Sequence, residues 1–327
     1  MHMADALVVP AVSCVMYGAS AAVLGFSIHK LRREDELTEK ISNMGVVGAF
    51  IFAAQMINFT IPGTGSSGHI CGGMLASAIL GPYAGFITMS AVLIIQCLLF
   101  ADGGILALGC NVWNMAFYSC LLGAIVFWRP ILKSNPSKHK IMLASILGCV
   151  LSLQLGSFSV VLETTASGIT DLPFGVFVGV MQPIHLAIGV VEGIITGVIL
   201  SFVYEARPTL LDSLNVSTPQ TRRNVPRKKV LAIFLLLTIV IAGGLSLAAS
   251  ALPDGLEWSI EKLTGSTELE ANGSLYSITE SVQDITSIFP DYSLPGRGDS
   301  LGTSFSGIVG AVLLVVVFAA VCFIVKL

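Results

Sequence analysis

The first two residues carry the clearest candidate metal ligands, because a histidine directly follows the initiator methionine. A side chain as large as that of His2 is expected to prevent removal of Met1, which leaves a free α-amine. The Met1 amine, the backbone nitrogen of His2 and its Nδ1 atom can then close two fused, unstrained chelate rings around one metal ion. Ni(II) and Cu(II) favour such planar nitrogen sites. The N-terminus is therefore predicted to bind a transition metal.

A planar site needs a fourth donor, and His69 is the natural candidate. It lies in a glycine-rich stretch with the sequence Gly-Thr-Gly-Ser-Ser-Gly-His-Ile-Cys-Gly-Gly, whose glycines permit close approach of the backbone. The stretch formally matches G-x-G-x-x-G, but the sequence predicts neither a strand before it nor a βαβ unit, which excludes a dinucleotide site. Cys71 could add a thiolate, although packing is the preferred interpretation. The alternative for the two histidines is an unselective polar terminus and a loop residue bonded to backbone.

Polar residues inside apolar segments form a second set of candidates, since they are costly there and often functional. They occur in pairs at helical spacing: Gln55 with Asn58, Asn111 with Asn114, and His185 with Glu192. We expect these side chains either to orient the metal ligands from a second layer or to form hydrogen bonds between helices. For His185 and Glu192, a packing or gating network is the preferred interpretation, ahead of direct metal ligation.

The composition identifies the environment that must position these residues. Of the 327 residues, 54% are hydrophobic and only 11% are charged, whereas soluble domains carry about 25% charged residues. The 17 basic and 20 acidic residues leave no basic excess, which excludes a nucleic-acid partner. Alternating barrel strands are absent, so the chain is predicted to be an all-α integral membrane protein in contact with lipid.

Nine apolar segments are predicted to span the membrane. They are residues 6–29, 42–60, 70–82, 84–101, 105–128, 141–162, 175–204, 230–251 and 305–325. Residues 1–28 contain no Lys or Arg, so the first segment is interpreted as a retained span with the N-terminus outside. On this count, 15 of the 17 basic residues fall on the cytoplasmic side, in agreement with the positive-inside rule.

The spans divide into two parts. Residues 1–205 are predicted to form a seven-span body, and a basic cytoplasmic linker at 206–229 leads to a two-span module at 230–327. The outer segment of that module, residues 252–304, contains nine acidic and two basic residues, a net charge of −7. We expect it to form a small lobe that aids loading or gating. The metal ligands are expected to lie entirely within residues 1–205.

Four motifs resemble the CbiM/NikM family, the substrate-binding membrane components of energy-coupling-factor nickel and cobalt transporters. They begin at Met1 (Met-His-Met-Ala-Asp-Ala-Leu), Pro62 (Pro-Gly-Thr-Gly-Ser-Ser-Gly-His), Phe100 (Phe-Ala-Asp-Gly-Gly) and Met181 (Met-Gln-Pro-Ile-His-Leu-Ala-Ile-Gly-Val-Val-Glu-Gly). The resemblance covers about residues 1–205, and the two-span module looks like a fused NikN/CbiN-type subunit. It implies that Met1, His2 and His69 bind Ni(II) or Co(II) as the transported substrate.

The resemblance also implies partners, namely a transmembrane coupling subunit and cytoplasmic ATPase subunits in a prokaryotic cell membrane. The sequence contains no G-x-x-x-x-G-K-[ST] phosphate loop, which fits ATP hydrolysis by a partner and a non-enzymatic role for this chain. Three alternatives remain: a stand-alone cation carrier or channel, a membrane metal sensor, and a membrane enzyme. No H-E-x-x-H motif supports the enzyme. Neither the choice between nickel and cobalt nor the affinity follows from the sequence.

Overall fold

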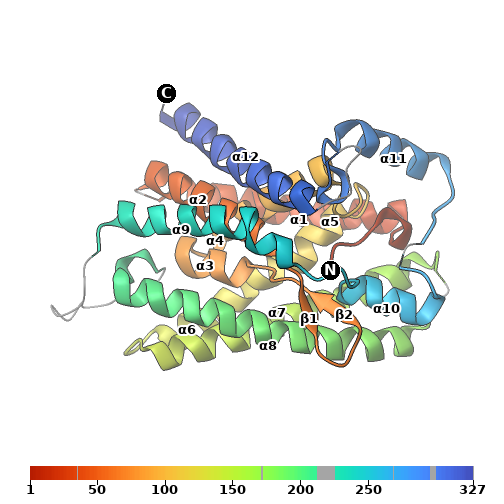
Figure 1. The fold of residues 1–327 in the computed structure, drawn as a ribbon, viewed down its shortest axis with the longest axis horizontal. Helices are drawn as coiled ribbons and strands as arrows, with labels where there is room; N and C mark the ends of the chain where they lie inside the picture. The colour runs from red at the N-terminus through yellow and green to blue at the C-terminus, as the bar shows by residue number, and fades with distance from the viewer. Residues whose placement is uncertain (35, 171, 212–224, 268, 295–299, 327) are drawn as a thin grey trace.

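The protein is a bundle of long helices with one small hairpin (Figure 1). The computed structural model describes residues 1–34, 36–170, 172–211, 225–267, 269–294 and 300–326. Within these ranges, six helices are long and apolar enough to cross a membrane: α1 (Pro10–Leu31), α4 (Pro82–Phe100), the helix Leu108–Leu132, α7 (Lys138–Ser167), α8 (Phe174–Ala206) and residues Leu301–Val325 of α12 (Ser300–Lys326). The fold is thus that of a helical, multi-pass membrane protein.

Three of the predicted spans correspond to helices that do not meet these criteria. α2 (Leu37–Gln55) begins with charged residues, and α9 (Arg227–Gly243) has 17 residues. α3 (Gly73–Leu80) has only eight residues, which gives a length of about 12 Å, less than half of the hydrocarbon core. The predicted crossing at 70–82 is therefore wrong as a complete helix, because the chain is not helical up to Gly72, which has a left-handed backbone conformation with a φ of 83°.

The missing half of that crossing is an extended segment that enters the bundle. A two-stranded antiparallel hairpin, β1 (Phe59–Ile61) and β2 (Ser66–Gly68), precedes it. α3 then begins beside the middle of the helix Leu108–Leu132, where an added Cβ on Gly73 would collide with Ser119. A tight turn at Gly81, which has a φ of 85°, reverses the chain into α4, as the Gly-Pro sequence predicts.

Backbone groups at this depth need partners inside the protein, because lipid offers none. Glu192 from α8 supplies two of them, since its carboxylate oxygens accept hydrogen bonds from the amides of Cys71 and Gly72, both at 2.9 Å. Gln55 from the end of α2 donates to the Cys71 carbonyl at 2.7 Å. Glu192 and Gln55 therefore hold the segment that follows His69.

The helix Leu108–Leu132 joins three pieces in one continuous rod. Its central part, η2 (Val112–Trp128), is wound in wider π turns, and the shorter α5 (Leu108–Asn111) and α6 (Arg129–Leu132) flank it. π turns inside helices are frequent at functional sites. Asn111 and Asn114 lie near the start of this rod, where the N-terminal segment packs.

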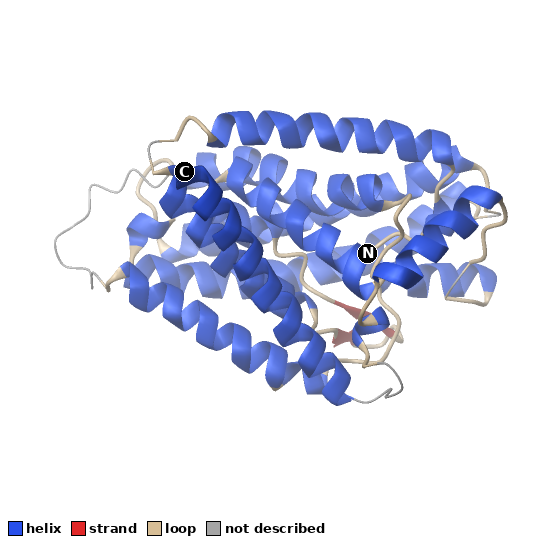
Figure 2. Cartoon of the chain, turned by 90° about the horizontal axis from the view of Figure 1, so that it is seen from above, coloured by secondary structure: helices blue, strands red, loops and turns tan. Residues whose placement is uncertain are grey.

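The C-terminal helices pack directly on the body. α12 and α9 lie along α2 (Figures 1 and 2), and every residue of α2 from Met44 to Gln55 is buried. The approach is close: an added Cβ on Gly310 would come within 2.1 Å of the Phe52 ring. Small residues permit such contacts between membrane helices. At the start of α9, the Arg227 guanidinium donates a hydrogen bond to the Asn43 side-chain oxygen at 2.6 Å. Residues 212–224 of the predicted basic linker, with Arg222 and Arg223, lie outside the described residues.

The lobe between α9 and α12 covers the hairpin. It contains α10 (Gly255–Thr264) and α11 (Ser274–Thr286), with short 3-10 turns η4 (Leu245–Ala248) and η5 (Pro290–Tyr292) at its edges. The Ser67 amide donates to the Pro253 carbonyl at 2.8 Å, and Trp258 donates to the Thr64 carbonyl at 3.0 Å. We refer to this side of the molecule as the lobe end, and to the side that holds Arg207 and Arg227 as the linker end.

Candidate metal centre

The N-terminal segment is folded into the lobe end instead of extending into solvent. Met1 is 5% exposed and Met3 is fully buried, and the turn η1 (Asp5–Leu7) leads into α1. Asn111 binds both backbone groups of Met3: its Oδ1 accepts from the amide at 2.7 Å and its Nδ2 donates to the carbonyl at 3.1 Å. Asn114 lies beneath, donating to Glu163 at 2.7 Å. These two asparagines therefore fix the position of the N-terminal amine.

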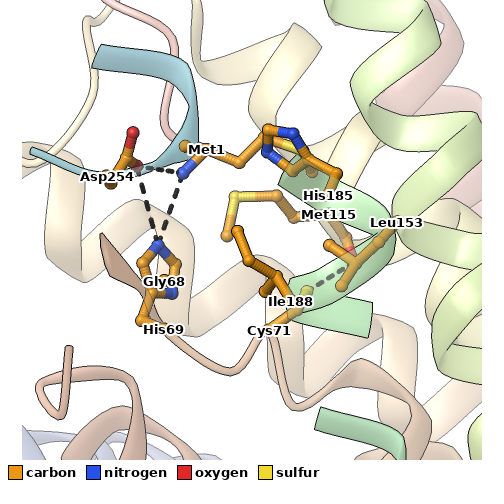
Figure 3. Close-up of a pocket in the computed structure, with 10 residues that line it drawn as sticks. Met1, Gly68, His69, Cys71, Met115, Leu153, His185, Ile188 and Asp254 are labelled. Atoms are coloured by element: carbon orange, nitrogen blue, oxygen red, sulfur yellow. Dashed lines mark hydrogen bonds and ion pairs between the residues drawn. The ribbon is translucent and has the colours of Figure 1, made fainter. Parts of the chain in front are cut away.

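The Met1 amine meets His69 and an aspartate from the lobe (Figure 3). The amine nitrogen lies 3.4 Å from His69 Nε2 and forms an ion pair with Asp254. The same Asp254 oxygen lies 3.9 Å from His69 Nε2. Two of the predicted metal ligands, 68 residues apart in the chain, are therefore neighbours in the structure. The carboxylate between them comes from the C-terminal module.

His2 lies beside these groups but points its Nδ1 elsewhere. Its ring stacks on that of His69, with centroids 5.5 Å apart. His2 Nδ1 lies 3.0 Å from an oxygen of Asp102, while its Nε2 is buried and has no partner among the described residues. Tyr292, also from the C-terminal module, donates to the other Asp102 oxygen at 2.5 Å. The chelate predicted from the sequence requires His2 Nδ1 to leave Asp102.

The protonation of His69 suits a metal ligand. Its Nδ1 lies 3.2 Å from the Ile70 carbonyl, which can only accept, so Nδ1 carries the proton and Nε2 presents its lone pair to the Met1 amine. Burial, followed by the positive charge of the amine and the proximity of His2, lowers the pKa of His69 to about 4. The ring is therefore neutral at physiological pH, the form in which imidazole binds metals.

Two carboxylates keep their charge next to these nitrogens. Burial alone would raise the pKa of Asp102, but the charge of His2 and hydrogen bonds from His2 and Tyr292 lower it to about 2. Burial likewise opposes ionisation of Asp254, yet the Met1 amine and His69 hold its pKa well below the usual range. The site thus brings two negative charges close to its nitrogen donors, which favours a divalent cation over a neutral ligand.

The other predicted polar residues have different positions. Asn111 and Asn114 hold Met3, while Gln55 and Glu192 hold the segment after His69, so these four support the segments that carry the ligands. The backbone carbonyl of Asn58, rather than its side chain, is engaged, by the Ser250 amide at 2.8 Å. His185 and Glu192 share α8 but contact different groups, since His185 Nδ1 lies 2.8 Å from the Met181 carbonyl.

Sequence reasoning missed the contribution of the lobe. Asp254 and Tyr292 lie in a region that the sequence treats as an auxiliary module without ligands. One signal was available, because Asp254 and Glu257 are spaced as in a capping box, which the structure forms at the start of α10. This pattern identifies a helix start, but it does not reveal that the second carboxylate oxygen of Asp254 reaches the N-terminus 253 residues away.

Comparison with known families gives two matches within the chain. Residues 2–210 match the CbiM family, described as the cobalt uptake substrate-specific transmembrane region, and residues 228–327 match the PDGLE domain. The chain belongs to the CbiM family. The PDGLE sequence itself is Pro253 to Glu257, which includes the aspartate that contacts the Met1 amine. The PDGLE domain therefore meets the CbiM region at the predicted ligands.

Relatives of this CbiM-family chain are transport proteins from archaea and bacteria. A protein of Archaeoglobus fulgidus that is named as a fused nickel transport protein, NikMN, is 37% identical over 317 residues, which cover 96% of this chain and 95% of the relative. A cobalt transport protein, CbiM, of Sorangium cellulosum is 29% identical over 66% of this chain. A solved structure described as a truncated transition metal transporter aligns with a TM-score of 0.55 at 28% identity, over 63% of this chain and 99% of that one.

These relatives, together with the six apolar helices, identify the chain as a multi-pass membrane protein of the nickel and cobalt transport type. The prediction of a metal transport protein is confirmed at this level. The resemblance of the C-terminal module to an accessory subunit is likewise confirmed by the PDGLE match.

Proposed function

We propose that this protein is the substrate-specific component of an ATP-driven energy-coupling-factor importer, and that it captures Ni(II) or Co(II) on the outer side of the membrane. The observation that carries the proposal is the 3.4 Å approach of the Met1 amine to His69 Nε2, with His2 stacked alongside. Nitrogen donors from two distant segments converge at one end of the bundle, next to two ionised carboxylates.

The ligand set would consist of the Met1 amine, the backbone nitrogen and Nδ1 of His2, and Nε2 of His69. Four nitrogens that include a deprotonated amide favour a planar ion, and this arrangement suits Ni(II) better than Zn(II) or Mg(II). Binding in this mode requires His2 Nδ1 to exchange Asp102 for the metal, and the Met1 amine to exchange Asp254. The two carboxylates then remain nearby as counter-charges.

The energy for transport would come from partner proteins. The sequence has no phosphate-binding loop, so a transmembrane coupling subunit and cytoplasmic ATPases would drive release of the ion. The basic residues at the linker end fit a cytoplasmic location for that end. The lobe end would then face outward, with its acidic surface beside the site.

The first test is isothermal titration of the purified protein with Ni(II). Extension of the N-terminus by one residue before Met1, or its acetylation, removes the free amine and is expected to abolish binding. His69→Ala is expected to lose most of the affinity, while the matched variant His139→Ala, at an exposed position in α7, retains it. Full nickel affinity in a protein with a blocked amine would contradict the proposed ligand set.

The second test separates an importer with partners from a stand-alone carrier. Proteoliposomes with this chain alone are compared with proteoliposomes that also hold the coupling subunit and ATPases. Accumulation of ⁶³Ni is expected only in the second preparation and only with ATP. Uptake by the chain alone would favour the carrier instead, and binding without uptake in either preparation would favour a metal sensor.

A further inference from the structure

A cavity borders the Met1 amine and His69, and Asp254 and Gly255 of the lobe form part of its wall (Figure 3). Its volume is about 10 Å³, close to the room that one water-sized sphere requires. Besides these residues, it is lined by His185, Cys71 and Met115. We call the last three residues the inner donor cluster, because each carries an atom that can bind a transition metal.

His185 is the member of this cluster that lacks an explanation. It is 1% exposed, and its Nδ1 must carry the proton because that atom faces the Met181 carbonyl at 2.8 Å. Its Nε2 therefore presents a lone pair, and this atom has no hydrogen-bond partner among the described residues. A buried acceptor left without a partner is destabilising. An imidazole kept in this state on the wall of a cavity is suited to a ligand.

The lobe closes the cavity above His185. An added Cβ on Gly255 would lie 3.0 Å from His185 Cε1 and 3.3 Å from Nε2, so glycine permits the approach of the first turn of α10. Gly255 directly follows Asp254, which is paired with the Met1 amine. The same turn of the PDGLE domain thus contacts the outer nitrogen donors and covers the inner donor cluster.

Two sulfur atoms complete the cluster. The Cys71 thiol donates to the Met115 carbonyl at 3.2 Å, and in Figure 3 the Met115 side chain lies between Cys71 and the His185 ring. Both residues also line a second cavity of about 10 Å³, whose wall includes Cys149 and Glu192. Glu192 lies seven residues beyond His185 on α8, about 10 Å closer to the linker end. The two cavities are therefore adjacent along the direction of transport.

We propose that His185 Nε2, with the sulfur atoms of Cys71 and Met115, forms a second metal site that receives the ion from the outer nitrogen ligands. This inference rests on the proposed capture of Ni(II) or Co(II) and adds the next position of the ion. Imidazole and sulfur donors select late transition metals over Mg(II) and Ca(II). Cys71 binds as the thiolate and releases one proton for each ion bound.

The second site binds more weakly than the first. Among the residues that the structure describes, no three His, Cys, Asp or Glu side chains converge to hold an ion. The inner donor cluster supplies two such side chains and one thioether, without a chelate ring. Lower affinity suits a transfer position, because an ion must be able to leave each site on its path.

The site is tested with Co(II), whose thiolate complexes have an intense charge-transfer absorption. In the double variant His2→Gln/His69→Ala, which keeps Met1 behind a large second residue but lacks the outer imidazoles, one Co(II) is expected to bind with this absorption and with a Kd at least about tenfold higher than in the intact protein. Adding Cys71→Ser is expected to remove the absorption, and adding His185→Gln to raise the Kd a further tenfold or so. Cys97→Ser, a buried cysteine outside both cavities, is the matched control.

Transport provides a second readout. His185→Gln alone is expected to retain Ni(II) binding at the outer site within about twofold, while the initial uptake rate with partner subunits falls by about tenfold or more. An unchanged uptake rate would overturn the transfer role. Absence of cobalt–thiolate absorption in the double variant, when the intact protein still binds Ni(II), would overturn the inner site and leave the proposed function intact. If the intact protein binds no Ni(II), the proposed function fails instead.

Discussion

Glu192→Gln tests how the buried acid on α8 supports the predicted metal ligand His69. In the structure each carboxylate oxygen accepts one backbone N–H, from Cys71 and from Gly72, both at 2.9 Å. A glutamine has the same shape but only one accepting oxygen, and its NH₂ group would face the other backbone N–H. One amide at the start of α3 therefore loses its partner, in a buried position where neither water nor lipid can replace it.

The magnitude follows from that single amide. A buried donor without a partner costs about 1–3 kcal/mol. If the segment stays in place, this cost appears as lower stability. If it relaxes, His69 moves from the Met1 amine, and metal binding must restore the original position, which weakens Ni(II) affinity by about 5- to 150-fold. The sum of the two losses is expected to equal the cost of the one amide.

Both quantities are measured on the same protein, by thermal denaturation without metal and by titration with Ni(II). Glu163→Gln is the matched control, because Glu163 is also a buried acid but accepts from the Asn114 side chain and from no described backbone amide. We expect a lower midpoint, a higher Kd or both for Glu192→Gln, and changes below about 1 kcal/mol for the control. If Glu192→Gln matches wild type in both assays, the carboxylate does not hold this segment.

Three further predictions concern the lobe and the titration of the site. Asp254→Asn breaks the ion pair with the Met1 amine, so an acylating reagent should label that amine roughly tenfold faster. The control variant Asp284→Asn, at an exposed position in α11, should leave the labelling rate unchanged. A chain truncated after residue 205 should still bind Ni(II) but support little uptake with its partners; loss of binding, or unimpaired uptake, would contradict this division of labour. Because the pKa of His69 is lowered to about 4, the unfolded chain binds the extra proton first, so stability should fall as the pH drops from about 6.5 toward 4. His69→Gln should reduce this fall, and an identical pH profile of the melting midpoint in both proteins would show that His69 is not buried as described.

The sequence predicts the class of fold from its apolar runs. It also predicts that Met1 and His69 lie on the same side of the membrane, because each belongs to a recognisable local motif. Long apolar runs must become membrane helices, and a free amine next to a histidine is a pattern that favours binding of a transition metal. The site depends on longer-range contacts as well. Asp102 is visible only as an acid in a loop, and nothing in its neighbourhood indicates that it pairs with His2 and Tyr292.

The half-length α3 shows why span counting from hydropathy has a limit here. Residues 70–82 are as apolar as a membrane-spanning helix, so hydropathy predicts that they cross the membrane. Gly72 instead adopts a left-handed conformation before the helix, Gly73 permits a close approach to Ser119, and Glu192 accepts hydrogen bonds from the amides of Cys71 and Gly72. A buried acid far away in the sequence therefore decides where this helix begins, and periodicity within the segment carries no trace of it.

The ion pair between Met1 and Asp254 also constrains how the protein is made. Its partners are 253 residues apart, so the surroundings of the Met1 amine are complete only after Asp254 has been synthesised. Until then the terminal amine is open to modifying enzymes, and any group added to it would be buried against His69. Assembly of this centre therefore requires the C-terminal module to be present, and it closes a very long loop. Chains released before residue 254 would carry the nitrogen donors without the cover that the finished protein gives them.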